Sequence, residues 1–275
     1  MGRVILVLCD ALRDDTARER MGFLEHLVEV RQASRYTVLA ELPTLSRPCY
    51  EAIHTGTPAT EHGVWHNKVV RRSKMPNLFG LARAAGHATA ASAYYWVSEL
   101  YNRAPFDPIE DREVDDTEQP IQHGRFYSED SYPDSEVLIA AAALARRFQP
   151  GYLLVHPMGL DFRGEEFGSD SAEYRNWATR QDALLAGLVP EWLGAGYTVL
   201  VTGDHGMNSD GSHGGTTPDV RQVPLYVITS RQSGLGDTDS QISQLQLAPT
   251  ICTLMAMPIP ISMGQPVIRG LEAEL

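Results

Sequence analysis

The feature that most constrains the fold is a repeated alternation between short apolar runs and segments with helical character. Continuous apolar runs of this length indicate strands that are buried on both faces. Residues 4–9 are the clearest such run, and the segments 36–42, 87–94, 152–156, 197–202 and 223–229 are also predicted to be strands. The segments with helical character are 76–86, 135–148 and 171–193, and Pro190 is expected to kink or break the last of them. This alternation predicts an α/β fold with a mostly parallel central sheet and helices on both faces.

One stretch, residues 97–134, departs from the alternation. It is rich in Pro, Tyr, Asp and Glu, lacks a clear period, and is too long to be an ordinary connection. It is therefore either a disordered insert or a functional lid, and its aromatic residues favour a lid because they can pack. These residues are Tyr101, Phe106, Phe126, Tyr127 and Tyr132. We expect a single domain over residues 1–275 with a small cap or lid insertion at 97–134.

Composition narrows the classes of partner and compartment. A formal net charge of −12 disfavours nonspecific binding to nucleic acid or to anionic membranes. The three cysteines are odd in number and widely spaced, which argues against a disulfide framework and for a reducing compartment. The apolar run at residues 4–9 is too short for a signal-peptide core or a membrane span. We therefore predict a cytoplasmic protein with no nucleic-acid or membrane partner, and leave the oligomeric state open.

Polar residues follow three of the predicted strands closely, at their carboxyl ends. They are Asp10, Asp161, Asp204 and His205, with His213 further along a glycine-rich stretch. Ligands bind outside the carboxyl ends of strands in open α/β sheets, and three carboxylates buried together without a cation would repel one another. A polar surface turn explains residues 201–215 taken alone, but the whole set favours a metal site. A donor set that mixes carboxylates with imidazole suits Zn, Mn or Fe better than it suits Ca.

A candidate nucleophile, Ser46, follows the predicted strand at 36–42. Arg47 and Pro48 then open what reads as a short helix, whose free N–H groups favour an anion. A hydroxyl in that place can bind a metal, lose its proton and attack a phosphorus centre. The alternative is that Ser46 simply caps the helix.

Several motifs together resemble the alkaline phosphatase superfamily, and within it the type I phosphodiesterase/nucleotide pyrophosphatase branch. They are PTLSRPCYEAIHTGTPATEHGV (43–64), VLCDALRDD (7–15), GLDFRGEEFGSDS (159–171) and TGDHGM (202–207), with a similar tail at 247–267. The likeness covers nearly all of the chain outside 97–134.

The resemblance implies two divalent metal ions, with Zn favoured and Mn or Mg as alternatives, and a covalent intermediate on Ser46. By this resemblance one metal is held by Asp10, Ser46, Asp204 and His205. The other is held by Asp161, the residue at position 165 and His213.

Two positions depart from the family pattern. Glu165 stands where a His ligand is usual, and a Glu there is harder and more anionic. Cys49 stands where nucleotide pyrophosphatases usually carry an Asn that touches a phosphate oxygen, and a thiol is a weak donor. Arg47 either provides that missing contact or is a solvated or ion-paired arginine. The candidate substrate-binding residues are Arg47, Cys49 and Asn67.

The predicted function is a metal-dependent hydrolase of phosphate esters or anhydrides acting through phospho-Ser46, on a small phosphate ester or nucleotide-like substrate. Phosphomonoesterase, phosphonate hydrolase and phosphomutase activities remain open on the same scaffold, as does a non-catalytic metal-binding protein. A sulfatase is disfavoured, because Tyr50 replaces the Arg that formylglycine formation needs.

Overall fold

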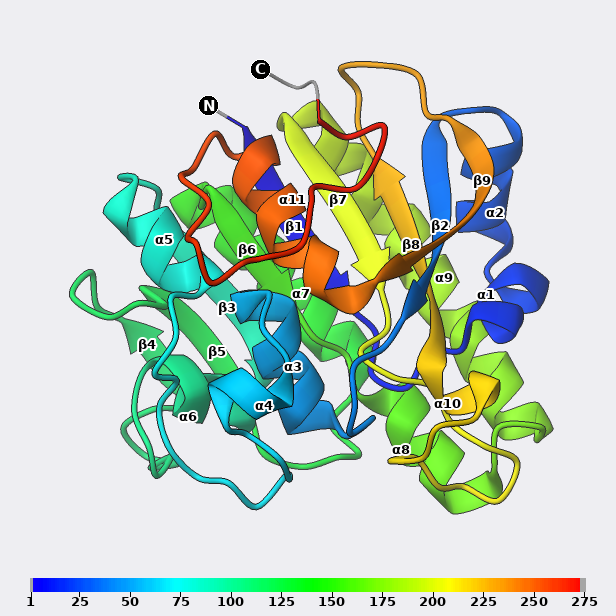
Figure 1. Cartoon of the computed structure of the whole chain (residues 1–275), viewed down its shortest axis with the longest axis horizontal. Coiled ribbons are helices and arrows are strands. Elements are labelled where there is room, and N and C mark those ends of the chain that lie inside the picture. The colour runs from blue at the N-terminus through cyan, green and yellow to red at the C-terminus, as the bar shows by residue number, and fades with distance from the viewer. Residues whose placement is uncertain (1, 273–275) are drawn as a thin grey trace.

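The computed structural model describes residues 2–272 and contains one central sheet (Figure 1). Within these residues the sheet has nine strands in the order β4-β5-β3-β6-β1-β7-β8-β2-β9. The strands are β1 (Arg3–Leu8), β2 (Ala33–Leu39), β3 (Thr89–Tyr94), β4 (Glu113–Asp115), β5 (His123–Tyr127), β6 (Tyr152–Val155), β7 (Tyr197–Thr202), β8 (Gln222–Ile228) and β9 (Gly236–Ser243).

The middle of the sheet is parallel. β1 pairs in parallel with β6 and β7, and β3 pairs in parallel with β5 and β6. β8 runs antiparallel between β7 and β2, and β4 closes the other edge antiparallel to β5. The predicted mostly parallel α/β sheet is confirmed. Its topology brings the carboxyl ends of β1, β6 and β7 side by side.

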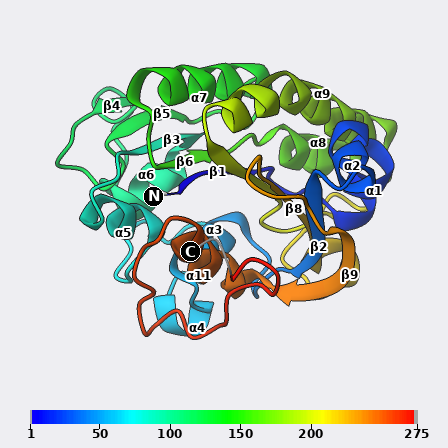
Figure 2. The same ribbon diagram turned by 90° about the horizontal axis from the view of Figure 1, so that it is seen from above.

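Helices cover both faces of the sheet, as Figure 2 shows. One layer contains α1 (Asp14–Arg20), α2 (Gly22–Glu29), α7 (Asp134–Phe148), α8 (Gly159–Phe167) and α9 (Ala172–Gly194). The opposite face carries α3 (Ser46–Thr55), α4 (Ala59–His62), α5 (Leu78–Ala84) and α11 (Leu247–Leu254). The remaining helices are α6 (Tyr95–Tyr101), α10 (Pro218–Arg221) and the 3₁₀ turn η1 (Gln244–Gln246).

The side chains of β1 alternate between the two faces of the sheet, so they contribute to two core clusters, one under each helical layer. Leu6 and Leu8 belong to the cluster under α3 and α11, whereas Ile5 and Val7 belong to the cluster under α7 and α9. Because successive side chains of a strand point to opposite faces, a continuous apolar run serves both clusters. This is why the central strands were predictable from their sequence.

Two predicted elements differ from the structure. β2 spans Ala33–Leu39 rather than 36–42, because polar Arg35 is buried in the strand and paired with Asp14 and Glu25. The helix at 171–193 is not broken at Pro190: α9 continues to Gly194. The Pro190 ring lies on an exposed position of a long helix that is packed along its other side. The missing backbone donor therefore costs less than unpacking the helix would.

The segment 97–134 contributes directly to the sheet. It contains β4 and β5, and β5 pairs in parallel with β3. Phe126 and Tyr127 are buried in the two core clusters, which explains why this aromatic segment is ordered. Part of it therefore extends the sheet instead of standing apart as an added cap. A role in covering the site stays a prediction.

The three cysteines, Cys9, Cys49 and Cys252, are buried free thiols. In the part of the chain that the structure describes, no helix combines the length and apolar character that crossing a bilayer requires.

Candidate active site

Residues from both helical layers converge beyond the carboxyl ends of the central strands. Asp10 follows β1 and Asp204 with His205 follows β7, while Asp161 lies in the first turn of α8 after β6. Ser46 is the first residue of α3, on the other side of the sheet. The fold therefore assembles the site from segments that are far apart in the sequence.

Two groups of side chains have the spacing of metal ligands. Asp10, Asp204 and His205 form the first, and Asp161, His205 and His213 form the second. Within each group the ligand atoms lie within 4.8 Å of one another. His205 belongs to both groups, so the two candidate metal positions are adjacent.

The carboxylates of these groups fit divalent cations. Within residues 2–272, no hydrogen-bond partner reaches Asp10 Oδ1, Asp161 Oδ1 or Asp204 Oδ2, and all three atoms are buried. A buried carboxylate oxygen without a donor is costly, and a coordinated cation removes that cost. Three such atoms, combined with imidazole nitrogens, make a donor set that suits Zn or Mn.

The two histidines are held in the tautomer that metal binding requires. His205 Nδ1 lies 2.9 Å from the Gly206 carbonyl oxygen, and His213 Nδ1 lies 3.1 Å from that of Thr44. A carbonyl only accepts, so each ring donates from Nδ1, and in its neutral form each ring keeps a lone pair on Nε2. The rings stack with centroids 4.2 Å apart. His205 Nε2 lies 3.5 Å from Asp10 Oδ1 and His213 Nε2 lies 3.8 Å from Asp161 Oδ1, so both Nε2 atoms face the carboxylates of the site.

The electrostatics of the site reflect crowded carboxylates. Burial raises the pKa of Asp161 well above its usual value, and the charges of Asp10 and Glu165 raise it further. Burial and the charge of Asp10 likewise raise the pKa of Asp204. Burial also acts to raise the pKa of Asp10, but hydrogen bonding, chiefly from His156, outweighs it and lowers that pKa to about 2. A divalent cation would relieve the repulsion among these acids.

Ser46 does not cap α3, and its role as a nucleophile stays a prediction. The N-cap of α3 is Leu45, and no side chain makes a capping hydrogen bond there. Ser46 Oγ instead lies 3.1 Å from Nε2 of His205. Burial, followed by the charge of His213, lowers the pKa of His205 to about 3. The neutral Nε2 therefore accepts a hydrogen bond from the Ser46 hydroxyl.

Glu165 lies at the rim of the site. Its Oε1 is 3.4 Å from His213 Nε2, and its side chain is 53% exposed. Asp161 Oδ1 is 3.8 Å from the same nitrogen. Glu165 lies outside both groups of metal-ligand spacing, and its role as a ligand stays a prediction.

Arg47, a predicted substrate contact, is buried and ion-paired. Its Nη2 lies 2.7 Å from Glu99 Oε2, and its Nη1 donates to the Val69 carbonyl at 3.0 Å. The guanidinium also packs over the Trp96 ring, 4.7 Å from its centroid. Of the interpretations considered for Arg47, the ion-paired one describes its side chain, and a substrate contact stays a prediction.

The other two predicted substrate contacts lie beside the start of α3. Asn67 Oδ1 accepts from the Arg47 backbone N–H at 3.0 Å, which places this amide near Ser46. Cys49 is fully buried, and its Sγ faces the carbonyl oxygens of Glu41 and Pro43 at 3.8 and 3.6 Å. Burial raises the pKa of the Cys49 thiol, as do the charges of Asp204 and Asp10, so the thiol stays protonated.

Two further residues contact the site and were not identified from the sequence. His156 Nε2 lies 3.0 Å from Asp10 Oδ2, and the Tyr50 hydroxyl donates to the same oxygen. His156 ends the predicted strand at 152–156, so the placement that singled out Asp10 could also have found it. Tyr50 lies four residues after Ser46, one helical turn along the same face of α3.

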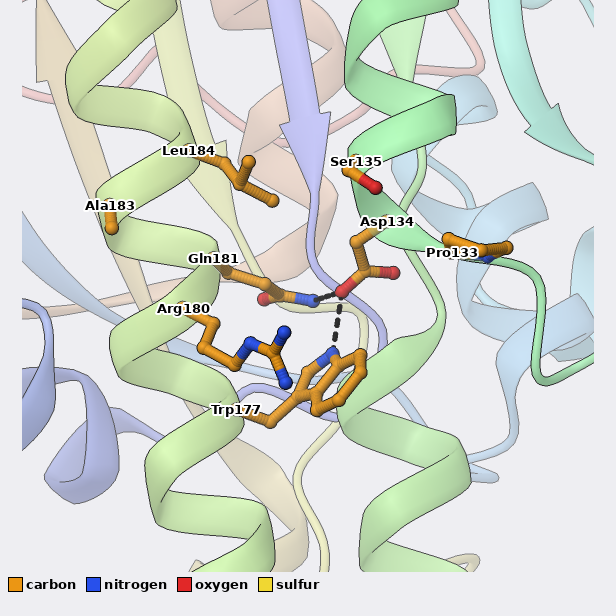
Figure 3. Close-up of a pocket in the computed structure, with 8 residues that line it drawn as sticks. All are labelled: Pro133, Asp134, Ser135, Trp177, Arg180, Gln181, Ala183 and Leu184. Carbon is orange, nitrogen blue, oxygen red and sulfur yellow. Dashed lines mark hydrogen bonds between the residues drawn. The ribbon is translucent and has the colours of Figure 1, made fainter.

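A cavity of about 360 Å³ between α7 and α9 is lined by residues that are neither candidate metal ligands nor predicted substrate contacts (Figure 3). There Asp134 Oδ2 accepts from Trp177 Nε1 at 2.7 Å and from Gln181 Nε2 at 2.8 Å, and both side chains point toward it. Its Oδ1 accepts from the Gly159 N–H at 3.0 Å. Asp134 thus anchors the start of α8, the helix that carries Asp161.

Curated relatives match nearly the whole chain. The catalytic subunit of GPI ethanolamine phosphate transferase 2 from Homo sapiens is 26% identical over 98% of this chain and 28% of its own length. GPI ethanolamine phosphate transferase 2 from Candida albicans is 24% identical over 94% of this chain and 30% of its own length. The chain therefore spans less than a third of these relatives.

Solved structures share the fold at low sequence identity. Murine ectonucleotide pyrophosphatase/phosphodiesterase 5, as an inactive variant in complex with AMP, superimposes with a TM-score of 0.75 at 12% identity, covering 94% of this chain and 96% of that one. A phosphonate monoester hydrolase from Silicibacter pomeroyi gives a TM-score of 0.71 at 15% identity, covering 100% and 77%. Both have the alkaline phosphatase-like fold.

The profile of one family matches residues 4–213, a span that includes every candidate metal ligand and Ser46. The chain therefore belongs to the type I phosphodiesterase/nucleotide pyrophosphatase family of the alkaline phosphatase superfamily, an enzyme family that acts on phosphoesters.

Proposed function

We propose that this chain catalyses in-line displacement at the phosphorus of a phosphate ester or anhydride through a covalent intermediate on Ser46. The observation that carries the proposal is the 3.1 Å contact between Ser46 Oγ and His205 Nε2. It lies beside three buried carboxylate oxygens that have no hydrogen-bond donor among the described residues and could bind a cation. Membership of a phosphoester-handling family supports the same chemistry.

The donor sets suit two divalent ions. Asp10, Ser46, Asp204 and His205 would hold one, and Asp161, Glu165 and His213 the other. Zn is favoured by the mixture of carboxylate and imidazole, with Mn or Mg as alternatives. Bound there, the ions would lower the pKa of the Ser46 hydroxyl and neutralise charge on the oxygens around phosphorus.

The chain's own residues supply orientation and the bond-forming atom. With no metal bound, His205 Nε2 holds the Ser46 hydroxyl at the metal position; with a cation bound, that lone pair would be taken up and loss of the hydroxyl proton to solvent would be favoured. Ser46 Oγ then forms a bond to phosphorus as the bond to the leaving oxygen breaks. The N-terminus of α3, which begins at Ser46, lies next to the charge that develops, and the helix dipole favours an anion there. Asn67, whose Oδ1 is held by the Arg47 N–H, would offer its Nδ2 to a phosphoryl oxygen. Water then cleaves the phosphoserine and restores the hydroxyl.

A second candidate is transfer to an alcohol acceptor instead of to water. It is favoured by the similarity of 94–98% of the chain to ethanolamine phosphate transferases. The two candidates share the first half-reaction and differ only in which hydroxyl opens the phosphoserine. Monoester, phosphonate and phosphomutase substrates remain alternatives for the same site.

The test is a panel of chromogenic phosphodiesters, monoesters and phosphonates, assayed with Zn²⁺, Mn²⁺ or Mg²⁺ and with or without an added acceptor alcohol. We expect Ser46→Ala to lower turnover by about 10³-fold or more while metal content is retained. Mass spectrometry of the quenched wild type should find the phosphoryl adduct on Ser46. Comparable turnover in Ser46→Ala would exclude the covalent mechanism, and the product ratio with acceptor separates hydrolysis from transfer.

A further inference from the structure

We infer that His156 and Tyr50 are positioning residues that hold the Asp10 carboxylate in one orientation, so that a single oxygen faces the metal position and Ser46. The inference rests on the proposed two-metal site and adds two residues to it that were not among the site residues predicted from the sequence.

Both residues donate to the same carboxylate oxygen. His156 Nε2 lies 3.0 Å from Asp10 Oδ2, and the Tyr50 hydroxyl donates to that oxygen from the opposite helical layer. The other oxygen, Oδ1, lies 3.5 Å from His205 Nε2 and has no donor among the described residues. Turning the carboxylate by a quarter turn about its Cβ–Cγ bond would break both hydrogen bonds, whereas a half turn only exchanges two equivalent oxygens.

His156 is itself fixed in place. The Tyr94 backbone N–H lies 3.4 Å from its Nδ1, and because an N–H only donates, the imidazole proton belongs on Nε2, facing Asp10. The Tyr127 hydroxyl donates to the His156 carbonyl oxygen at 2.6 Å. The ring meets the Tyr50 ring edge-on with centroids 4.8 Å apart. His156, Tyr50 and Asp10 are all 0% exposed, so no solvent competes for these bonds.

This arrangement has a consequence for coordination. A carboxylate can bind a cation through one oxygen or both, and two donors on Oδ2 favour binding through Oδ1 alone. Hydrogen-bond partners of this kind commonly change metal affinity by about 10–100-fold when removed. A purely structural role predicts something different, namely lower stability of the fold with metal affinity unchanged.

The experiment measures Zn²⁺ affinity of the metal-depleted full chain by chelator competition. An Asp161→Asn background leaves the Asp10 site to be measured alone. We expect Tyr50→Phe and His156→Leu each to weaken binding by about 10–100-fold. His156→Gln keeps an N–H that can reach Asp10 and should recover much of the loss.

The chain offers a matched control pair, His54 on α3 and Tyr152 on β6. His54 is also fully buried, with Nδ1 on the Tyr50 carbonyl oxygen at 2.8 Å and Nε2 3.2 Å from the Tyr152 hydroxyl. His54→Leu and Tyr152→Phe remove a buried imidazole and a buried hydroxyl that do not touch Asp10. Both should leave Zn²⁺ affinity within about twofold of the wild type.

Wild-type affinity in both Tyr50→Phe and His156→Leu would overturn the inference, as would equal losses in the control pair. Tyr50→Phe is nearly isosteric, so it carries the test alone if His156→Leu fails to fold. Loss of affinity in these variants, with Ser46→Ala still active, would refute the proposed covalent function and leave the positioning role standing. Normal affinity in these variants, with Ser46→Ala inactive, would refute the positioning role and leave the proposed covalent function standing.

Discussion

The Arg47 guanidinium lies 2.7 Å from the Glu99 carboxylate, and the two side chains are only 1% and 5% exposed. The other Glu99 oxygen accepts from the Phe106 N–H at 3.0 Å. Since Arg47 directly follows Ser46, this ion pair joins the start of α3 to α6 and to the segment 97–134. It holds α3, the helix that begins at Ser46, against a segment that carries none of the family motifs.

Breaking this ion pair should destabilise the protein strongly. Glu99→Gln leaves the Arg47 charge buried without a counter-ion, so we expect the free energy of unfolding to fall by about 3–5 kcal/mol in urea denaturation. Glu191→Gln is the control, because its pair with Arg146 is exposed at 37% and 68% and should change stability by less than about 0.5 kcal/mol. Similar small effects in both variants would show that the buried pair adds no net stability.

Glu165 should influence the metal position at Asp161 and His213 and not the one at Asp10 and Asp204. We expect Glu165→Ala to weaken or empty the position shared with Asp161 and His213, while the position at Asp10 and Asp204 persists. Glu165→His should shift preference from Mn toward Zn, because imidazole is a softer and uncharged ligand.

Metal titration of both Glu165 variants checks this. Glu166→Ala is the matched control, since the neighbouring carboxylate pairs with Arg163 at 2.8 Å and is 45% exposed. Unchanged stoichiometry and affinity in Glu165→Ala would show that this residue is not a ligand.

Acid should destabilise the fold through His54. Burial lowers the pKa of His54 from 6.5 to about 4, so the folded state resists protonation that the unfolded chain accepts. The contribution of neutral His54 to the free energy of unfolding is therefore complete above pH 6.5 and is lost as the pH falls toward 4. The loss amounts to about 3 kcal/mol.

Urea denaturation between pH 7.5 and 4 measures this contribution. The unfolding free energy of His54→Leu should fall less steeply than that of the wild type over that range. His62, whose pKa burial also lowers to about 4, is present in both proteins and cancels in the comparison. Parallel curves would show that His54 is not the source of the acid sensitivity.

Phe106 should affect the choice of leaving group. The centroids of the Phe106 and Tyr95 rings are 5.3 Å apart, and those of the Tyr95 and Trp96 rings are 6.1 Å apart. The Trp96 ring in turn packs against the Arg47 guanidinium. Phe106→Ala should change kcat/KM for bulky phosphate esters by about 10-fold and spare a small activated ester. Ile109→Ala, at a site 86% exposed in the same segment, is the control. An unchanged substrate profile in Phe106→Ala would remove the support for a lid.

Local pattern was enough to predict the central strands and the residues that follow them. β1, β6 and β7 are almost entirely apolar, and a strand buried on both faces favours apolar side chains at nearly every position. The parallel topology that such runs imply brings Asp10, Asp204 and Asp161 to one edge. These features were predictable because each depends on neighbours in the sequence or on a general rule of sheet topology.

Tertiary structure decided what depends on partners that are distant in the chain. Asp10 and His156 are 146 residues apart, and neither residue type indicates that they meet. The same holds for Arg47 and Glu99, which are 52 apart, and for Arg35, whose burial in β2 requires Asp14 and Glu25. A charged or polar side chain can be buried only where another segment supplies its counter-charge or hydrogen-bond partner. Because that partner is chosen by the packing of the whole fold, the local sequence does not specify it.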